Sequence, residues 1–267
     1  MIKQRLITGV ILAALVLLGV FYLSPLVFAF CAAGVVALAA HEWGNFASLG
    51  AAGRWLYMLV CLAAVALLHF VTPAVNTPVL VIAVLFWLWA CYMVVSYPAR
   101  KLDCQKLKLL VGLVVIVPAW LALVMLKSMQ EGELALVMLM LLVWGADTGA
   151  YCAGKLLGRR KLIPNVSPGK TVEGLLGGLA TSVVIGLAIG LWRELPASAL
   201  VYLVALSLVT CLASVLGDLF ESLFKRERGI KDSGRILPGH GGILDRIDSL
   251  TAAAPIFMLG LHWAPMF

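Results

Sequence analysis

Apolar residues fill nine long runs along the chain, and short polar segments separate these runs. Several runs exceed the roughly 18 apolar residues that a helix needs to cross the hydrocarbon core of a bilayer. The runs therefore predict nine transmembrane helices, over residues 6–23, 25–40, 55–71, 79–97, 109–126, 134–153, 172–192, 197–216 and 251–265. Only Ser24 and Pro25 separate the first two runs, so we expect a tight hairpin or a re-entrant pair there.

The composition excludes a water-soluble fold. Of the 267 residues, 63% are hydrophobic and only 12% are charged, and the mean hydropathy is +1.06. A soluble domain cannot bury this much apolar surface. The expected fold class is all-α, and the chain is a polytopic integral membrane protein. We expect a single integral membrane domain over residues 1–267, in which 1–140 form N-terminal helices and 141–250 hold catalytic segments at the cytoplasmic face.

Basic residues give the orientation of the predicted helices. With the N-terminus in the cytoplasm and the C-terminus outside, 18 of the 20 Lys and Arg residues lie in cytoplasmic segments. Only Lys127 and Arg193 lie outside, so the arrangement satisfies the positive-inside rule. The net charge of +7 then follows from topology and from contact with anionic lipid headgroups. It indicates no nucleic-acid partner.

The six cysteines are scattered along the chain and lie mostly within the apolar runs. They form no CxxC pair, and no spacing of Cys and His is suited to zinc. We interpret them as small core residues.

Asp147 is a charged residue inside an apolar run. Such a residue costs about 2.5–3.5 kcal/mol on insertion scales, so it usually faces a cavity or a partner. Asp147, Tyr151 and Lys155 are spaced i, i+4, i+8 and share one helical face. An Asp–Lys or Asp–Tyr bond between helices would also explain the spacing. Because the polar stripe runs toward a basic loop, we predict that Asp147 and Tyr151 bind substrate.

The stretch 167–174, SPGKTVEG, begins the seventh run. It is not a P-loop, because that pattern requires Gly five positions before Gly169, where Pro164 stands. We also expect no preceding strand in a helical membrane protein. The start of a helix still offers free N–H groups and a favourable dipole to anions. We predict that four residues here bind substrate: Ser167, Lys170, Thr171 and Glu173. A helix-capping role for Glu173 is an equal alternative.

The most polar stretch is 222–248, SLFKRERGIKDSGRILPGHGGILDRID, which we call the signature segment. Together with Asp218 and Glu221 just before it, it interleaves six acidic with six basic residues. A solvated basic loop would explain the bases but not the interleaved acids. Acidic oxygens suit Mg²⁺ or Mn²⁺, while basic side chains and glycine backbone accommodate phosphate. The segment therefore predicts a site for a cation and a phosphate-rich substrate.

Helical spacing brings these acids onto two helix ends. One face of a helix leaving the eighth run carries Asp218, Glu221, Ser222 and Lys225. Asp245 and Asp248 form an i, i+3 pair at the entry to the ninth run. We expect the two acidic ends to meet around a divalent cation.

Two histidines receive different interpretations. His240 lies between two glycines of the signature segment, where we predict a contact to phosphate or support for another ligand. The triplet His41-Glu42-Trp43 follows the second run, and we interpret it as an interfacial anchor without chemistry.

The signature segment resembles that of the phosphatidate cytidylyltransferases, also called CDP-diacylglycerol synthases. The matching positions are Ser222, FKR at 224–226, KDSG at 231–234, Leu237, Pro238, HGGI at 240–243 and DRID at 245–248. The segment around Asp147 and the SPGKTVEG stretch are similar to other characteristic segments of that family. The resemblance in length covers the whole chain, and its specific positions lie within 144–248.

The resemblance implies a reaction in which CTP and phosphatidic acid give CDP-diacylglycerol and pyrophosphate, in phospholipid biosynthesis. It implies Mg²⁺ as the cofactor, with Mn²⁺ as an alternative and K⁺ as a possible further ion. The implied partners are membrane lipid and a second copy of the chain in a homodimer. The implied location is a bacterial-type inner (cytoplasmic) membrane, with the active site facing the cytoplasm.

The resemblance and the spacing together assign three sets of residues. The metal ligands are Asp218 and Asp245, with Glu221 in support. The catalytic set is Asp218, Asp245, Lys225, Arg226, Lys231 and Asp248. The substrate-binding set is Asp147, Tyr151, Ser167, Lys170, Thr171, Glu173, Ser222, His240 and Arg246.

Two alternatives remain open at this point. A related CTP-dependent polyprenol kinase, or another lipid cytidylyltransferase, would use the same residue types. A kinase releases CDP, whereas the favoured reaction releases pyrophosphate. A transporter is the more distant alternative. Secondary transporters often show inverted repeats and broken helices at mid-membrane. Here the polar clusters lie at one face and repeats are not evident.

Overall fold

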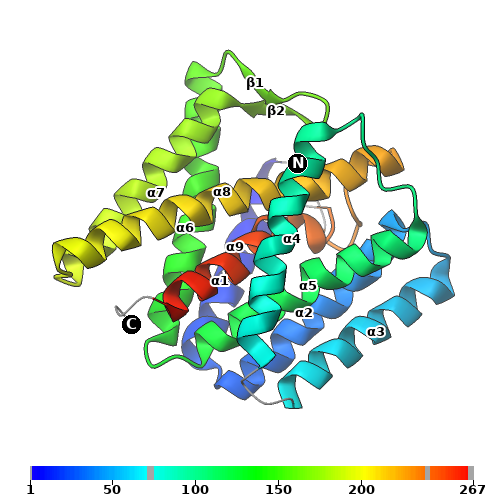
Figure 1. Cartoon of the computed structure of the whole chain (residues 1–267), viewed down its shortest axis with the longest axis horizontal. Coiled ribbons are helices and arrows are strands. Elements are labelled where there is room, and N and C mark those ends of the chain that lie inside the picture. Colours follow the sequence, from blue (N-terminus) through cyan, green and yellow to red (C-terminus); the bar gives the residue numbers. More distant parts are fainter. Residues whose placement is uncertain (1, 71–74, 238–240, 264–267) are drawn as a thin grey trace.

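The structure is a computed structural model that describes residues 2–70, 75–237 and 241–263. Within these ranges the chain forms nine α-helices and one antiparallel pair of strands (Figure 1). The helices are α1 (Ile2–Tyr22), α2 (Pro25–Phe46), α3 (Ala51–Phe70), α4 (Asn76–Ser96), α5 (Gln105–Lys127), α6 (Gly132–Leu157), α7 (Val172–Trp192), α8 (Ala197–Arg228) and α9 (Leu244–His262). The strands β1 (Lys161–Ile163) and β2 (Ser167–Thr171) connect α6 to α7.

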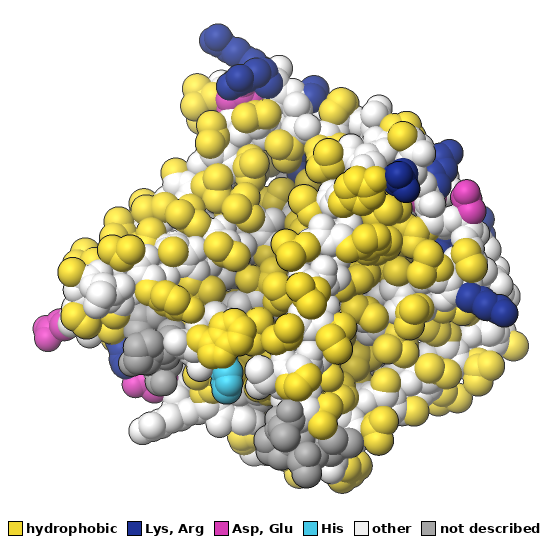
Figure 2. Space-filling view, in the orientation of Figure 1, with side chains coloured by type: hydrophobic (Ala, Val, Ile, Leu, Met, Phe, Trp, Pro, Cys, Tyr) yellow, Lys and Arg dark blue, Asp and Glu magenta, His cyan; other side chains and the backbone are white. Residues whose placement is uncertain are grey.

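Seven helices in the described part of the chain, α2 to α8, are long and apolar enough to cross a membrane. In α1 the segment Thr8–Tyr22 is apolar but shorter than these helices, and α9 carries Asp245, Arg246 and Asp248 in its first five residues. Figure 2 shows apolar side chains over most of the visible face, with basic side chains near its edges. The predicted polytopic, helical membrane fold is confirmed, while the count of nine spans stays a prediction.

Lys127 and Arg193, which the predicted topology places outside, lie apart from Lys108. Lys127 and Arg193 lie at the connections that follow α5 and α7, where they pair with Glu133 at 2.6 Å and Glu131 at 2.8 Å. At the opposite end of α5, Lys108 pairs with a carboxylate of α8 at 3.0 Å. The two residues expected to lie apart from all other bases therefore lie near each other, bridged by neighbouring acids.

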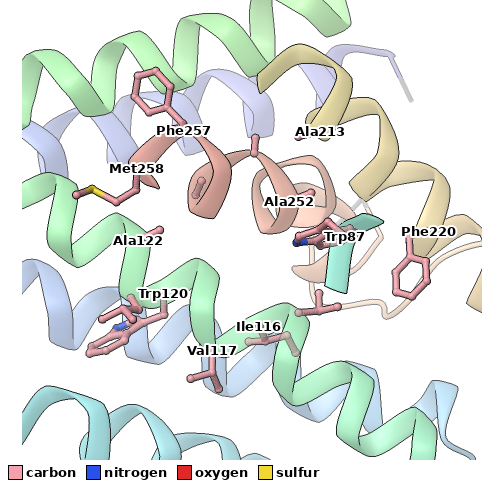
Figure 3. Packing of buried hydrophobic residues seen from close by; sticks show 14 of the residues in the cluster. Trp87, Ile116, Val117, Trp120, Ala122, Ala213, Phe220, Ala252, Phe257 and Met258 are labelled. Atoms are coloured by element: carbon pink, nitrogen blue, oxygen red, sulfur yellow. The ribbon is translucent and has the colours of Figure 1, made fainter. Parts of the chain in front are cut away.

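Helix α9 lies in the core of the molecule (Figure 3). Its residues Ala252–Ala254 are completely buried, and these small side chains allow close packing against α8, α5 and α4. Met258 lies near Ala122 of α5, whereas Phe257 points to the opposite side of α9 (Figure 3). Because the helix is surrounded by its neighbours, the polar residues in its first turns have fixed positions.

Helices α6 and α7 pack closely against each other. A Cβ atom added to Gly177 would collide with Ala153, and one added to Gly149 would collide with Thr181. Small residues at these positions let the two backbones approach. The polar faces of α6 and of the α7 amino terminus are thereby brought together.

The strand pair between α6 and α7 was not predicted. Residues 167–171 were expected to begin a helix, but they form β2 and pair with β1, with Lys161 opposite Thr171. Pro168 has no N–H and Gly169 is a poor helix former, so a helix is disfavoured at these positions. Helix α7 begins only at Val172, and the expectation that no strand precedes it was wrong.

Helix α8 has 32 residues, so it extends about 48 Å and exceeds the roughly 30 Å hydrocarbon core. Its last three turns carry the polar residues of the signature segment. The helix ends at Gly229, whose φ of 69° is the left-handed conformation that glycine adopts without strain.

Helix α2 continues to Phe46, six residues past the predicted end of the second run. Trp43 is 1% exposed, and its indole N–H donates to the Lys108 carbonyl at 2.8 Å. Its ring centroid lies 5.0 Å from that of Phe224 in α8. The interpretation of residues 41–43 as an interfacial anchor was therefore wrong, because Glu42 and Trp43 are buried among α5, α8 and the signature segment.

Candidate active site

A cavity of about 390 Å³ lies between α6, β2, α7 and α8. Its lining residues lie within 147–155, 162–175 and 215–218. The polar or charged side chains in its lining are Asp147, Tyr151 and Lys155 of α6, Lys170 and Thr171 of β2, and Asp218 of α8. The structure thus brings together predicted site residues from the polar stripe of α6, from the 167–174 stretch and from α8.

Lys170 and Asp218 form the ion pair that joins β2 to α8 across the cavity. The Lys170 Nζ atom lies 2.7 Å from Oδ2 of Asp218, and both side chains are partly exposed. Ser222, one turn further along α8, donates its hydroxyl to Oδ1 of Asp218 at 3.2 Å. A ligand that enters the cavity therefore meets the Lys170 ammonium group and the Asp218 carboxylate, and it can replace either one as the partner of the other.

The polar stripe of α6 faces the same cavity. Asp147, Tyr151 and Lys155 all line it, and the Lys155 Nζ atom lies 5.7 Å from the centre of the Tyr151 ring. Among the described residues, neither Tyr151 nor Lys155 forms a hydrogen bond or ion pair with Asp147. Both residues lie on α6 with Asp147, so the alternative of an Asp–Lys or Asp–Tyr bond between helices stays open.

The amino terminus of α7 is capped by the protein itself. Thr171 Oγ1 accepts from the Gly174 N–H at 3.1 Å, and the Val172 N–H donates to the Arg160 carbonyl at 2.9 Å. Free N–H groups were expected here for phosphate, but two of them already have partners. An anion at this end of the cavity would therefore meet chiefly the Lys170 ammonium group.

Glu173 and Ser167 do not line the cavity. Glu173 accepts from the backbone N–H groups of Arg159 at 3.0 Å and Arg160 at 3.1 Å. It therefore ties the segment after α6 to the first turn of α7, which agrees with a capping role better than with substrate contact. Ser167 is the first residue of β2, at the turn of the hairpin.

A second group of charged residues, Glu221, Lys225 and Asp245, is buried between α8 and α9, and we call it the buried charge cluster. Lys225 Nζ lies 3.1 Å from Oε1 of Glu221 and 2.9 Å from Oδ1 of Asp245. All three side chains are less than a tenth exposed. The ammonium group is thus held by carboxylates from two different helices.

Asp245 also organises the backbone of the signature segment. Its Oδ2 atom accepts from the Gly242 N–H at 2.8 Å, the Ser233 N–H at 2.9 Å and the Ser233 hydroxyl at 3.0 Å. Burial favours the neutral acid, but Lys225 and these N–H donors outweigh it, so the pKa of Asp245 lies below its usual range. Both oxygens of this carboxylate have protein partners, so a cation bound to Asp245 would have to replace Lys225.

Asp248 lies one turn after Asp245, where α8 and α9 are in backbone contact. A Cβ atom on Gly217 of α8 would collide with the Asp248 carbonyl. Burial, and then the negative charge of Asp218, raise the pKa of Asp248 to about 8. The two acidic helix ends therefore lie side by side, and this surrounding favours the neutral form of Asp248 near neutral pH.

The oxygen atoms at this junction fit a hard divalent cation that shares its coordination with a ligand. Within the described ranges, no three His, Cys, Asp or Glu side chains are placed to hold a metal ion by themselves. However, Oε2 of Glu221 is buried without a hydrogen-bond partner, and the negative charge of Asp218 helps to raise the pKa of Asp248. Magnesium commonly takes one or two carboxylates and completes its shell with phosphates and water.

The remaining predicted residues lie outside the cavity lining. Arg226 donates from Nε to the Val166 carbonyl at 3.0 Å and so braces the strand pair against α8. Lys231 and Arg246 are exposed. His240 lies outside the described residues.

Glu42 is the functional candidate that the sequence analysis missed. It is 1% exposed and accepts hydrogen bonds from the signature segment, although it belongs to α2. Asp147 was identified as a charge inside an apolar run, whereas Glu42 lies just after the predicted second run and so gave a weaker signal. The neighbouring Trp43 made an interfacial location the simpler interpretation.

Comparisons with known proteins show the family of the chain. The chain matches the model of the Cytidylyltransferase family over residues 3–264. It is 44% identical to a phosphatidate cytidylyltransferase of Pseudomonas aeruginosa, over 99% of this chain and 98% of the relative. Identity to a phosphatidate cytidylyltransferase of Haemophilus influenzae is 36%, over 96% and 97% of the two chains. These matches confirm the resemblance drawn from the signature segment, and the chain belongs to the cytidylyltransferase family.

Proposed function

We propose that this protein is a membrane-embedded cytidylyltransferase that transfers CMP from CTP to phosphatidate, giving CDP-diacylglycerol and pyrophosphate. The similarity to two bacterial phosphatidate cytidylyltransferases, over nearly the full length of each, supports the choice of substrates. The observation that carries the assignment to a site is the cavity, where Asp147, Lys170 and Asp218 converge from three elements.

The reaction needs two anionic reactants to approach each other. A phosphate oxygen of phosphatidate attacks the α-phosphorus of CTP and forms the new P–O bond. The bond from the α-phosphorus to its bridging oxygen breaks, and pyrophosphate leaves with the electron pair. No covalent enzyme intermediate is required, because the nucleophile is already an anion. The contribution of the protein is therefore positioning and the neutralisation of charge.

The cavity supplies the binding part of this task. Lys170 pairs with Asp218 and lies in a partly exposed position, where a triphosphate can replace the carboxylate as its partner. Tyr151 and Asp147 offer a ring and a carboxylate on the opposite wall. The acyl chains of phosphatidate reach this wall laterally from the bilayer, since the exposed surface of the helices is apolar.

We assign the cation site to the junction of α8 and α9. Asp218 would hold Mg²⁺, with Glu221 and Asp248 within the same carboxylate group, and Mn²⁺ has the same preference for oxygen ligands. Bound Mg²⁺ would neutralise charge on the triphosphate. Lys225 is fixed by Glu221 and Asp245 and adds positive charge beside this site. Asp245 as a metal ligand stays a prediction.

We further infer nine spans with a cytoplasmic N-terminus, an active site facing the cytoplasm and a homodimeric assembly. The grouping of Lys127 and Arg193 away from Lys108 supports the orientation. Labelling of single introduced cysteines in intact cells tests it, because a residue next to Lys170 should be protected from an impermeant reagent. Labelling there as fast as next to Arg193 would contradict the orientation.

The position of a radioactive label tests the reaction. Purified protein in detergent is incubated with phosphatidate, Mg²⁺ and CTP labelled in either the α- or the γ-phosphate. We expect the α-label in the lipid and the γ-label in pyrophosphate. A γ-label in the lipid, together with free CDP, would show a lipid kinase instead. If neither label enters the lipid in the presence of Mg²⁺ or Mn²⁺, the proposed function is contradicted.

A further inference from the structure

Glu42 of α2 lies in the centre of the signature segment, although it is about 190 to 200 residues away in the sequence. Its Oε1 atom accepts from the Ile243 N–H at 3.1 Å. Its Oε2 atom accepts from the Leu244 N–H at 2.8 Å and from the Ser233 hydroxyl at 3.0 Å. Both oxygens of the buried Glu42 carboxylate thus accept hydrogen bonds from the signature segment.

Glu42 supplies a helix cap that α9 lacks. The N-cap residue of α9 is Ile243, and no side chain of the helix itself caps its first turn. Isoleucine is among the poorest N-cap residues, because it offers no acceptor to the free N–H groups of a helix start. Glu42 accepts from two of these groups from a different helix, and the negative charge is favourable at a helix amino terminus.

The glycines of the signature segment also fit this carboxylate. A Cβ atom on Gly234 would collide with Oε1 of Glu42, and one on Gly242 would collide with Oε2. Two glycines that the sequence analysis assigned to phosphate binding therefore allow the backbone to close around Glu42. The segment is folded around a residue from the amino-terminal part of the chain.

A continuous chain of hydrogen bonds connects Glu42 to Lys225. The Ser233 hydroxyl lies 3.0 Å from Oε2 of Glu42 and 3.0 Å from Oδ2 of Asp245, so its single hydrogen is shared between two carboxylates. Asp245 in turn holds the Lys225 ammonium group at 2.9 Å. A change at Glu42 would therefore shift the carboxylate that fixes Lys225.

We propose that Glu42 is a positioning residue of the active site, which holds the signature segment so that Asp245 and Lys225 keep the geometry needed for transfer. This proposal rests on the proposed cytidylyl transfer for its catalytic consequence. Its structural part, the anchoring of residues 233 and 241–244 by α2, does not depend on the reaction. The amino-terminal helices then contribute to the active site as well as to the membrane domain.

The test compares the parent protein with Glu42→Gln. Glutamine has the same shape, but its NH₂ group would face N–H donors and remove one acceptor from the start of α9. We expect kcat to fall about 10- to 100-fold, because small displacements of catalytic groups have effects of this order. The KM for CTP should stay within about threefold, since the cavity is unchanged. Backbone amide hydrogen exchange in residues 241–250 should become faster.

Two further variants separate positioning from loss of fold. Glu131→Gln removes a carboxylate that pairs with Arg193 at the other end of the molecule, and it should keep kcat within about twofold of the parent. Ser233→Ala should lower kcat, and the double variant with Glu42→Gln should lose less than the product of the two single effects. Coupling of this kind is expected only for residues of one network.

The outcomes distinguish the two proposals. An unchanged kcat per folded molecule in Glu42→Gln overturns the positioning role, and so does a loss of kcat that multiplies independently with that of Ser233→Ala. Unchanged amide exchange in residues 241–250 overturns the anchoring of the segment. If the parent transfers no CMP but the exchange is faster in Glu42→Gln, the proposed function fails while the anchoring stands.

Discussion

The cavity and the buried charge cluster lie next to each other on α8, but they differ in how completely protein surrounds their charges. Lys170 and Asp218 in the cavity have side chains that are 25% and 31% exposed. In the cluster, the side chains of Glu221, Lys225 and Asp245 are 3–9% exposed. One ion pair can therefore exchange partners with a ligand, whereas the other group is held by the fold.

This difference has an energetic basis. A partly exposed ion pair contributes little to stability, so a substrate can replace one of its members at small cost. A buried ammonium group that loses a carboxylate partner is left with an uncompensated charge, which is strongly unfavourable. The cavity is suited to binding, and the cluster is suited to fixed geometry. Variants in the two regions should therefore separate catalysis from stability.

Removal of divalent cations should have the largest effect on turnover and little effect on the fold. A chelator should abolish transfer of CMP, because charge on the triphosphate is then not neutralised, and added Mg²⁺ or Mn²⁺ should restore it. The melting temperature of the protein in detergent should change little. A large drop in melting temperature on chelation would mean that the cation is structural, which would break the distinction between the two regions.

Asp245→Asn should reduce both turnover and stability. We expect turnover to fall about 1000-fold, because Lys225 loses one of its two partners and the signature segment loses an ionised acceptor. The free energy of unfolding should fall by about 3 kcal/mol, the order of magnitude for breaking a buried ion pair. Turnover assays and thermal melting in detergent measure the two effects. A variant with parental stability would show that Asp245 is not held as tightly as its contacts indicate.

Asp218→Asn should reduce turnover about 100- to 1000-fold, since the proposed cation ligand and a partner of Lys170 are lost. The melting temperature should stay close to that of the parent, in contrast to Asp245→Asn. The same two assays apply. Near-parental turnover would remove Asp218 from the active site and would move the cation site to another carboxylate.

Lys170→Gln should have a smaller effect, directed mainly at substrate binding. The KM for CTP should rise about 10-fold, which corresponds to the loss of one charged contact with the triphosphate. Lys106→Gln is the matched control, because Lys106 is exposed at the start of α5, and its KM should stay within about twofold of the parent. Equal effects of both substitutions on KM would mean that the response reflects net charge at the membrane surface.

The sequence predicted the helices and most of the cavity because both follow local rules. Apolar runs define spans, and spacings of three and four residues place Asp147 with Tyr151, and Asp218 with Ser222, on single helical faces. The signature segment indicated chemistry because its acids and bases are interleaved. These patterns need no knowledge of how the helices pack.

The contacts of Glu42 and the strand pair were not predictable in the same way. Glu42 meets residues about 200 positions away, and no local periodicity encodes a contact at that separation. The strands are three and five residues long and contain Pro168 and Gly169, so they lack the alternating pattern that identifies a strand. Packing of α2 and α6 against the later helices determined both features.

The most direct test of the account is the position of CTP in an experimental structure of the protein with bound CTP and Mg²⁺. We predict that the triphosphate lies in the cavity within hydrogen-bond distance of Lys170, that the cation contacts Asp218, and that Lys225 still pairs with Asp245. A triphosphate bound elsewhere, with the pair between Lys170 and Asp218 intact, would contradict the division into a binding cavity and a positioning cluster.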